Sequence, residues 1–73
     1  MLRLKYERVQ RGLSQRTVGI AARIPQPTLA FIENGRFLPY PDQLQRLANF
    51  FNVPSQELLK DVEIVTPMVE ERV

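Results

Sequence analysis

The stretch that most constrains the fold of this 73-residue chain runs from Leu13 to Gly35, and two prolines divide it. Pro25 and Pro27 are tolerated in the first turn of a helix but not in its interior, because proline has no N–H and clashes with the preceding turn. One helix must therefore begin at Pro25 or Gln26, and another must end before it. Ser14 is a good N-cap for the earlier helix, since its hydroxyl can accept from a free backbone N–H. The sequence predicts two short helices joined by a tight turn.

Three features describe the earlier helix of the pair: its apolar side, an interior glycine and its last residue. Val18, Ala21 and Ala22 form its expected apolar side. Gly19 lies in its interior, where glycine costs roughly 0.5–1 kcal/mol relative to alanine, so we expect another helix to approach closely there. Arg23 ends the helix at a place where glycine is usual. Because a left-handed conformation costs a non-glycine residue about 1–2 kcal/mol, we expect a tighter or differently shaped turn.

The second helix of the pair is expected from about Pro25 to Asn34. Helical spacing turns Leu29 and Ile32 inward. Glu33 lies near the inner edge, where Arg8 of a preceding helix is the best-placed cation to pair with it. The same spacing turns five residues outward: Gln26, Pro27, Ala30, Phe31 and Asn34.

A helix is also predicted on the N-terminal side of the pair, over Leu2–Arg11. Its expected inward face carries the residues at spacings of four, three and four, and it ends at a left-handed Gly12. These inward residues are Leu2, Tyr6, Val9 and Leu13.

Two more helices and a tail complete the chain. A proline and an acid in the first turn open a helix at Pro41–Asp42, and a short fifth helix opens at Pro54 or Ser55. Val62–Thr66 is rich in β-branched residues without a helical period, which indicates a possible strand that must pair with its own chain or with a second copy. We therefore predict an all-α, compact five-helix domain at residues 1–60, with a possible short C-terminal β-strand in a tail at residues 61–73.

Composition excludes several classes of function. The chain has no Cys and no His, so it lacks a thiol nucleophile, the commonest general base and the commonest metal ligands. No acids cluster, and no apolar run approaches the ~20 residues that span a membrane. We expect neither an enzyme nor a membrane protein, and we expect no cofactor and no metal.

Charge is divided unevenly along the chain. Residues 1–60 hold nine Lys and Arg against four acids, a net charge of +5. Residues 61–73 hold one Arg against four acids, a net charge of −3. A basic body suits a polyanionic partner, and the acidic tail should lie away from that partner.

From Leu13 to Leu59 the sequence resembles the phage-repressor-like helix-turn-helix domains, also called the Cro/C1-type or XRE family. The resemblance rests on the joint spacing of Ser14–Gln15, Gly19, Ile24, Gln26, Thr28, Leu29, Ile32, Glu33, Gly35–Arg36, Pro39, Leu44, Leu47–Ala48, Val53 and Glu57–Leu58–Leu59. It implies a five-helix fold that binds double-stranded DNA. It also implies that Gln15 contacts a phosphate, that Gln26 reads a base, and that Arg8 pairs with Glu33.

The expected DNA-binding residues combine this resemblance with the outward face of the second helix. They are Ser14, Gln15, Arg16, Arg23, Gln26, Pro27, Thr28, Phe31, Asn34 and Arg36. The chain departs from the family at the turn, where Arg23 replaces glycine and Pro25 replaces the usual Ser or Thr cap. Its groove-facing surface is also unusually apolar. Phe31 could contact a thymine methyl group, pack on an aromatic residue of the following loop, or lie in a protein interface.

Two functions follow as hypotheses. The first is a cytoplasmic, nucleoid-associated transcriptional regulator, a homodimeric repressor that reads the major groove. The alternative is a protein-interaction or antitoxin-like module, whose partner would bind through Phe31, Phe37 and Tyr40. Two dimerisation surfaces compete: the region of the fourth and fifth helices with Phe50 and Phe51, and the tail strand.

Overall fold

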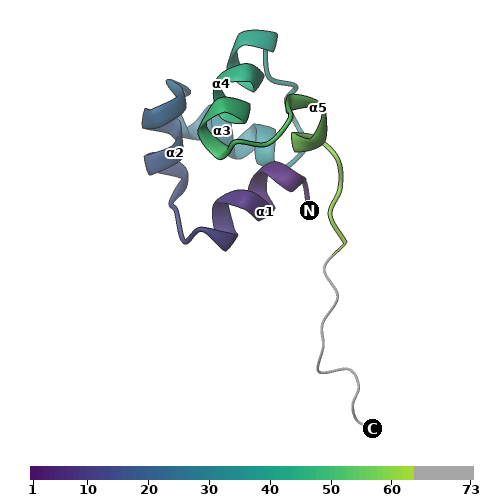
Figure 1. Ribbon diagram of the computed structural model, residues 1–73. Coiled ribbons are helices and arrows are strands. Elements are labelled where there is room, and N and C mark those ends of the chain that lie inside the picture. The colour runs from purple at the N-terminus through teal and green to yellow at the C-terminus, as the bar shows by residue number, and fades with distance from the viewer. Residues whose placement is uncertain (64–73) are drawn as a thin grey trace, which may run out of the picture.

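Five helices make up the fold over residues 1–63, which is the part of the chain that the computed structural model describes. They are α1 (Arg3–Gln10), α2 (Gln15–Ala22), α3 (Gln26–Glu33), α4 (Pro41–Phe51) and α5 (Ser55–Leu58). The predicted all-α, five-helix fold is confirmed. Figure 1 shows α2 at one side of the molecule and α5 at the other, with α3 between them. Each helix of residues 1–63 is too short to cross a membrane.

Local signals in the sequence set the helix ends, and the cap at Ser14 and the start of α3 after Pro25 are as predicted. Ser14 caps α2, because its Oγ accepts from the backbone N–H of Thr17 at 3.0 Å. Pro25 is the last residue before α3. Gly35 and Asn52 adopt left-handed conformations, with φ of 74° and 58°, just after α3 and α4. These residues supply the backbone geometry or the hydrogen bond that a helix end needs, so the chain carries its own boundaries.

Apolar side chains from all five helices form one core. Leu29 and Ile32 are fully buried, as their helical spacing predicted. Phe51 is fully buried too, so it cannot line a dimer interface, and of the two phenylalanines expected on that surface only Phe50 is exposed. Each such side chain contributes about 1.5–3 kcal/mol on burial. The core comprises Leu4, Val18, Ala22, Ile24, Leu29, Ile32, Leu47, Ala48, Phe51, Val53 and Leu58.

The inward face predicted for α1 is only partly right: Leu13 packs against the core, but the helix presents a different face to it. Leu4 is the buried residue of this helix, whereas Val9 is 47% exposed. Glu7 and Arg8 lie on the same side as Leu4, and their side chains are only 12% and 13% exposed. Ion pairs therefore occupy part of the inward face, and this charged face has no apolar period to detect. Similarly, Ala21 of α2 is exposed, so the apolar side of that helix is narrower than predicted.

The two ends of the described chain lie together. Val62 N donates to Met1 O at 2.7 Å, and Arg3 N donates to Lys60 O at 2.7 Å. Leu2 and Asp61 form an isolated antiparallel bridge between these bonds. Val62, the first residue of the predicted tail strand, thus pairs with its own chain, while residues 64–66 lie outside the described residues.

Candidate functional site

The turn between α2 and α3 is left-handed at Arg23, with φ of 58° and ψ of 46°. The expectation of a differently shaped turn is therefore wrong. Ile24 N donates to Gly19 O at 2.8 Å and Arg23 N donates to Ile20 O at 3.3 Å, a bond pattern that commonly ends helices at a glycine. These bonds and the burial of Ile24 offset the roughly 1–2 kcal/mol that a left-handed arginine costs.

Gly19 allows this turn to close on α2. A Cβ atom at Gly19 would lie 2.6 Å from the carbonyl oxygen of Ile24, far inside a normal contact. The close approach expected at Gly19 is present, but the approaching group is the backbone of the turn and the start of α3. Glycine at this position therefore brings the first residues of α3 against the side of α2.

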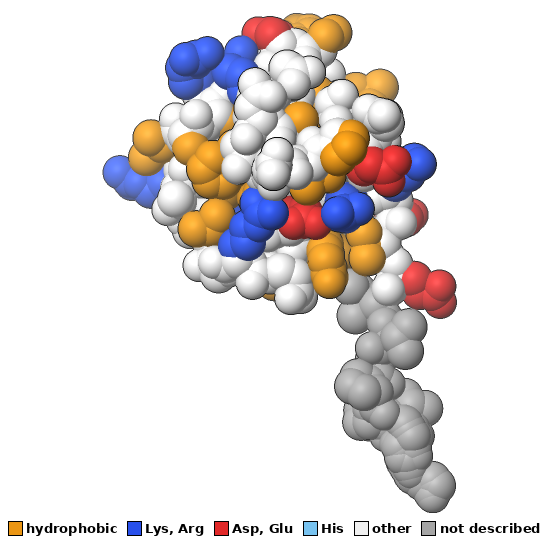
Figure 2. All heavy atoms as spheres, in the orientation of Figure 1, with side chains coloured by type: hydrophobic (Ala, Val, Ile, Leu, Met, Phe, Trp, Pro, Cys, Tyr) orange, Lys and Arg blue, Asp and Glu red, His pale blue; other side chains and the backbone are white. Residues whose placement is uncertain are grey.

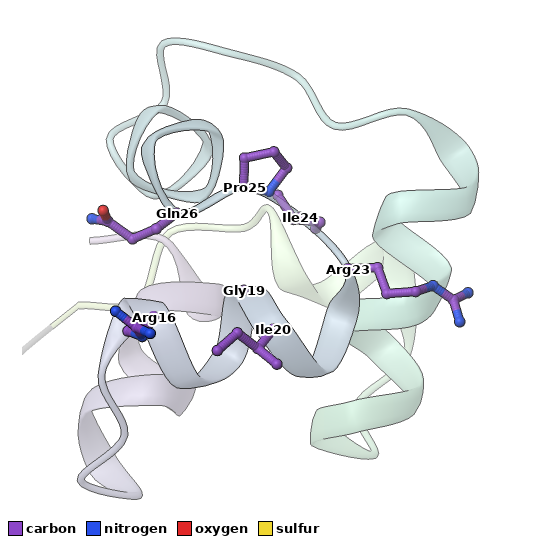
Figure 3. A pocket seen from close by; sticks show the side chains of 7 residues that line it. All are labelled: Arg16, Gly19, Ile20, Arg23, Ile24, Pro25 and Gln26. Atoms are coloured by element: carbon purple, nitrogen blue, oxygen red, sulfur yellow. The ribbon is translucent and has the colours of Figure 1, made fainter.

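An open groove of about 510 Å³ lies between the outer side of α2 and the start of α3 (Figure 3). Figure 3 shows Arg16 and Gln26 at one end of the groove and Ile20 in its middle. Arg23 lies at the other end, with its guanidinium directed away from the other lining side chains. Three residues of the predicted DNA-binding set thus share one groove. The lining residues are Arg16, Gly19, Ile20, Arg23, Ile24, Pro25 and Gln26.

A chain of hydrogen bonds joins this groove to the core. Glu33 is the buried charged residue among residues 1–63, and Arg8 holds its carboxylate with Nε at 2.7 Å and Nη2 at 3.0 Å. The predicted Arg8–Glu33 ion pair is confirmed. Gln15 Nε2 donates to the same carboxylate at 3.1 Å, and Gln26 Nε2 donates to Gln15 Oε1 at 2.8 Å. One charged contact in the interior therefore positions the first side chain of α3.

The buried carboxylate also fixes the direction of these bonds. A carboxylate only accepts, so Gln15 must present its Nε2 to Glu33 and its Oε1 to Gln26. Gln26 must then donate from Nε2. Its Oε1 and its second N–H remain at the surface as one acceptor and one donor. The amide of Gln26 is consequently oriented before any ligand arrives.

The other residues of the predicted DNA-binding set lie along α3 and beyond it. Pro27 and Thr28 occupy the first turn of α3, and Asn34 ends it. Phe31 is 51% exposed. Arg36 is exposed in the loop that follows. The structure thus places these five side chains on or after one helix, and their contact with DNA stays a prediction.

Arginine and lysine side chains divide into paired and free groups over residues 1–63. Arg3, Arg8, Arg11, Arg46 and Lys60 form ion pairs with acidic side chains. Within the same residues, Arg16, Arg23, Arg36 and Lys5 form none. Three of these four free cations lie on α2, in the turn or just after α3. Figure 2 shows basic side chains in separated groups on this face, some beside acidic side chains and others among hydrophobic and uncharged ones.

Sequence reasoning missed two residues of this region. Ile20 is 67% exposed in the groove. It lies two positions from the buried residues Val18 and Ala22, a spacing that places it on the opposite face of α2. Arg46 of α4 donates from Nε to Ala22 O at 2.6 Å. The position of Asp42, four residues before Arg46, is a signal for an ion pair within α4 but not for a contact with α2. The hydrogen bond that Arg46 donates to Asp42 lowers the pKa of the Asp42 carboxyl below the ordinary value of 3.8.

Most of this chain can be aligned with known proteins. Residues 4–58 match the family model described as helix-turn-helix. The chain is similar to the HTH-type transcriptional regulator DdrOP3 of Deinococcus deserti, with 38% identity over 61 residues. The aligned residues cover 84% of this chain and 47% of the relative. The chain therefore spans about half the length of the curated relative that it matches.

Proposed function

Since this chain belongs to the Cro/C1-type helix-turn-helix family, we propose that it is a DNA-binding regulator of transcription that reads the major groove with α3. The observation that carries the proposal is the oriented amide of Gln26 at the exposed start of this helix. An adenine edge in the major groove offers one acceptor and one donor, which a glutamine amide can match. Such a bidentate pair contributes about 1–3 kcal/mol of discrimination between bases.

Contacts with the phosphate groups of DNA would come from the unpaired arginine side chains around the groove. Arg16, Arg23 and Arg36 are exposed, and none is held by an acidic side chain of residues 1–63. The N-terminus of α2 adds free N–H groups beside Ser14 and Gln15, and a helix N-terminus favours a phosphate. Contacts of this kind supply affinity and make it steeply dependent on salt.

The proposed active form is a homodimer that represses a promoter by occupying it. A two-fold operator would set the two copies of α3 about 34–36 Å apart, one turn of DNA. Two features are candidates for dimerisation: the exposed Phe50 on α4 and the paired segment around the half-buried Val62. DNA as the target would give the protein a cytoplasmic, nucleoid-associated location.

Selection from a random pool of double-stranded DNA tests the proposal. We expect mobility shifts at low salt to enrich a two-fold sequence whose half-sites lie one turn apart. The Gln26→Ala variant should lose preference at one base pair of each half-site, while the Gln56→Ala variant, an exposed glutamine on α5, should select the original sequence. A pool that stays random at low salt would refute sequence-specific binding.

A second candidate is a protein-interaction module. It is favoured by four exposed apolar side chains on α3 and the following loop: Phe31, Phe37, Leu38 and Tyr40. Phe37 and Tyr40 form an edge-to-face pair with ring centroids 6.4 Å apart, whereas Phe31 remains half exposed. A Phe31→Ala variant that keeps its DNA affinity but loses a purified protein partner would support this candidate. Loss of DNA affinity in the same variant would instead assign Phe31 to the DNA surface.

A further inference from the structure

We propose that Arg46 on α4 is a positioning residue that fixes the α2–α3 turn, and through the turn the place of Gln26. The inference rests on the proposed function only for its effect on DNA. Its structural part concerns the backbone of the turn and stands independently. It assigns a role in target selection to a side chain that lies outside the predicted DNA-binding set.

Arg46 contacts the last residue of α2 and the left-handed residue after it. Its Nε donates to Ala22 O at 2.6 Å, and its Nη2 donates to Arg23 O at 3.4 Å. The carbonyl groups at the end of a helix have no partner within the helix. The turn bonds of Ile24 and Arg23 use the carbonyls of Gly19 and Ile20, which lie earlier in α2. Arg46 therefore donates to two of the carbonyls that the turn itself leaves open, those of Ala22 and Arg23.

Arg46 is itself held in place. Its Nη1 pairs with Asp42 Oδ2 at 2.8 Å, one turn earlier on the same helix, and its side chain is only 24% exposed. The next residue, Leu47, is fully buried, as is Phe51 at the end of α4. The guanidinium is thus fixed to the core through α4, and a planar fork held on one side presents its remaining donors in a fixed direction.

Positioning matters here because Arg23 sits in a strained conformation. Arginine is more stable in backbone conformations with negative φ, and a change to any of them would redirect Ile24 and Pro25. Gln26 follows three residues after Arg23, so a changed turn would displace its amide from Gln15 and from a bound base. A clamp on the carbonyls of Ala22 and Arg23 opposes that change.

Arg11 provides a matched control. It makes the same kind of contact at the end of a different helix, because its Nη2 donates to Phe51 O at 2.9 Å, the last residue of α4. It also pairs with an acid four residues away, Glu7, at 3.1 Å. Removing either arginine should therefore destabilise the fold to a similar extent, but only Arg46 touches the turn.

Amide hydrogen exchange tests the structural part without DNA. In Arg46→Ala we expect the exchange of Ile24 N–H to accelerate roughly tenfold more than that of Leu47 N–H, whereas Arg11→Ala should not separate these two amides. Arg46→Lys should recover part of the protection. If Arg46→Ala is too unstable to measure, Asp42→Asn gives the same comparison with a smaller change. Equal acceleration of both amides would overturn the proposal.

The DNA part is tested by the ratio of affinities for selected and random DNA at one salt concentration. We expect Arg46→Ala to lower this ratio roughly tenfold, the discrimination of one misaligned base contact, while Arg11→Ala leaves it unchanged. Equal loss of both affinities in Arg46→Ala would overturn a role in target selection. A wild-type protein with no preference would refute the proposed function, and the exchange result would still decide whether Arg46 fixes the turn.

Discussion

At the residue scale, the Arg8–Glu33 contact has consequences for both stability and orientation. Glu33 is 3% exposed and pairs with Arg8. It also accepts a hydrogen bond from Gln15, which in turn orients Gln26 at the groove. Removing Arg8 would leave the carboxylate buried without a cation. Breaking a buried pair in this way costs about 3–5 kcal/mol.

We therefore expect Arg8→Ala to lower the free energy of unfolding by about 3–5 kcal/mol, measured by chemical denaturation at pH 7. Lys60→Ala is the control, because Lys60 forms an exposed pair with Glu57 whose loss should cost less than about 0.5 kcal/mol. Similar, small losses in both variants would contradict a structural role for the buried pair.

Substitution of Arg23 should separate the strain of its left-handed backbone from the contact that its side chain is expected to make with DNA. Glycine adopts the left-handed conformation without strain, so Arg23→Gly should stabilise the fold by about 0.5–1 kcal/mol, measured by denaturation. If Arg23 contacts a phosphate, the same change should lower DNA affinity and reduce the salt slope by about one. Lys5→Ala removes a free cation of α1 and should alter neither the slope nor the stability by much. An unchanged slope in Arg23→Gly would remove Arg23 from the DNA-binding set.

The sequence predicted individual residues well where a local rule or a single pairing decided them. Ser14 as a cap and Arg8 as the partner of Glu33 are of this kind. The conformation of Arg23 was not predictable, because its cost is local whereas the bonds that offset it include donors from Arg46, more than twenty residues away. The groove that contains Ile20 likewise forms only when α2 and α3 are in place.

At the element scale, the helices that enclose the groove were predicted more reliably than the helix that supports them. α2 and α3 have caps, prolines and inward aliphatic residues that mark their ends and faces. α1 uses Glu7 and Arg8 on its inward side, so the apolar residues on its other faces gave a misleading period. A helix that packs through ion pairs cannot be oriented from hydrophobic spacing alone.

The packing of α2 on α3 predicts an unusual response to alanine at Gly19. Alanine normally stabilises a helix interior by about 0.5–1 kcal/mol relative to glycine. At Gly19 the added Cβ would meet the Ile24 carbonyl at 2.6 Å, so we expect Gly19→Ala to destabilise the fold by about 1–3 kcal/mol. Thermal or chemical unfolding measures the change.

The reverse substitution nearby gives the comparison for Gly19→Ala. Ala21 is an exposed residue of the same helix, and Ala21→Gly should cost only the ordinary 0.5–1 kcal/mol or so. If Gly19→Ala stabilised the fold, the turn would have to move away from α2 easily. That result would contradict the proposal that the turn is held in a fixed place.

At the scale of the whole molecule, the pairing of the chain ends predicts where the folded domain stops. A chain ending at residue 60 lacks the Val62–Met1 hydrogen bond and the Leu2–Asp61 bridge, whereas a chain ending at residue 63 keeps both. We expect the shorter chain to be about 1–2 kcal/mol less stable by denaturation. Equal stability would instead support the boundary at residue 60 that the sequence suggested.

That pairing also decides how the molecule can be tethered. Met1–Arg3 and Lys60–Val62 lie side by side, and Figure 1 shows this place across the molecule from α2. A tag or an immobilising linker joined to either residue 1 or residue 63 would therefore leave from the same spot and keep the groove accessible. A short connection between these two residues would bridge neighbours, so a circularly permuted form of residues 1–63 is within reach without rearranging the core.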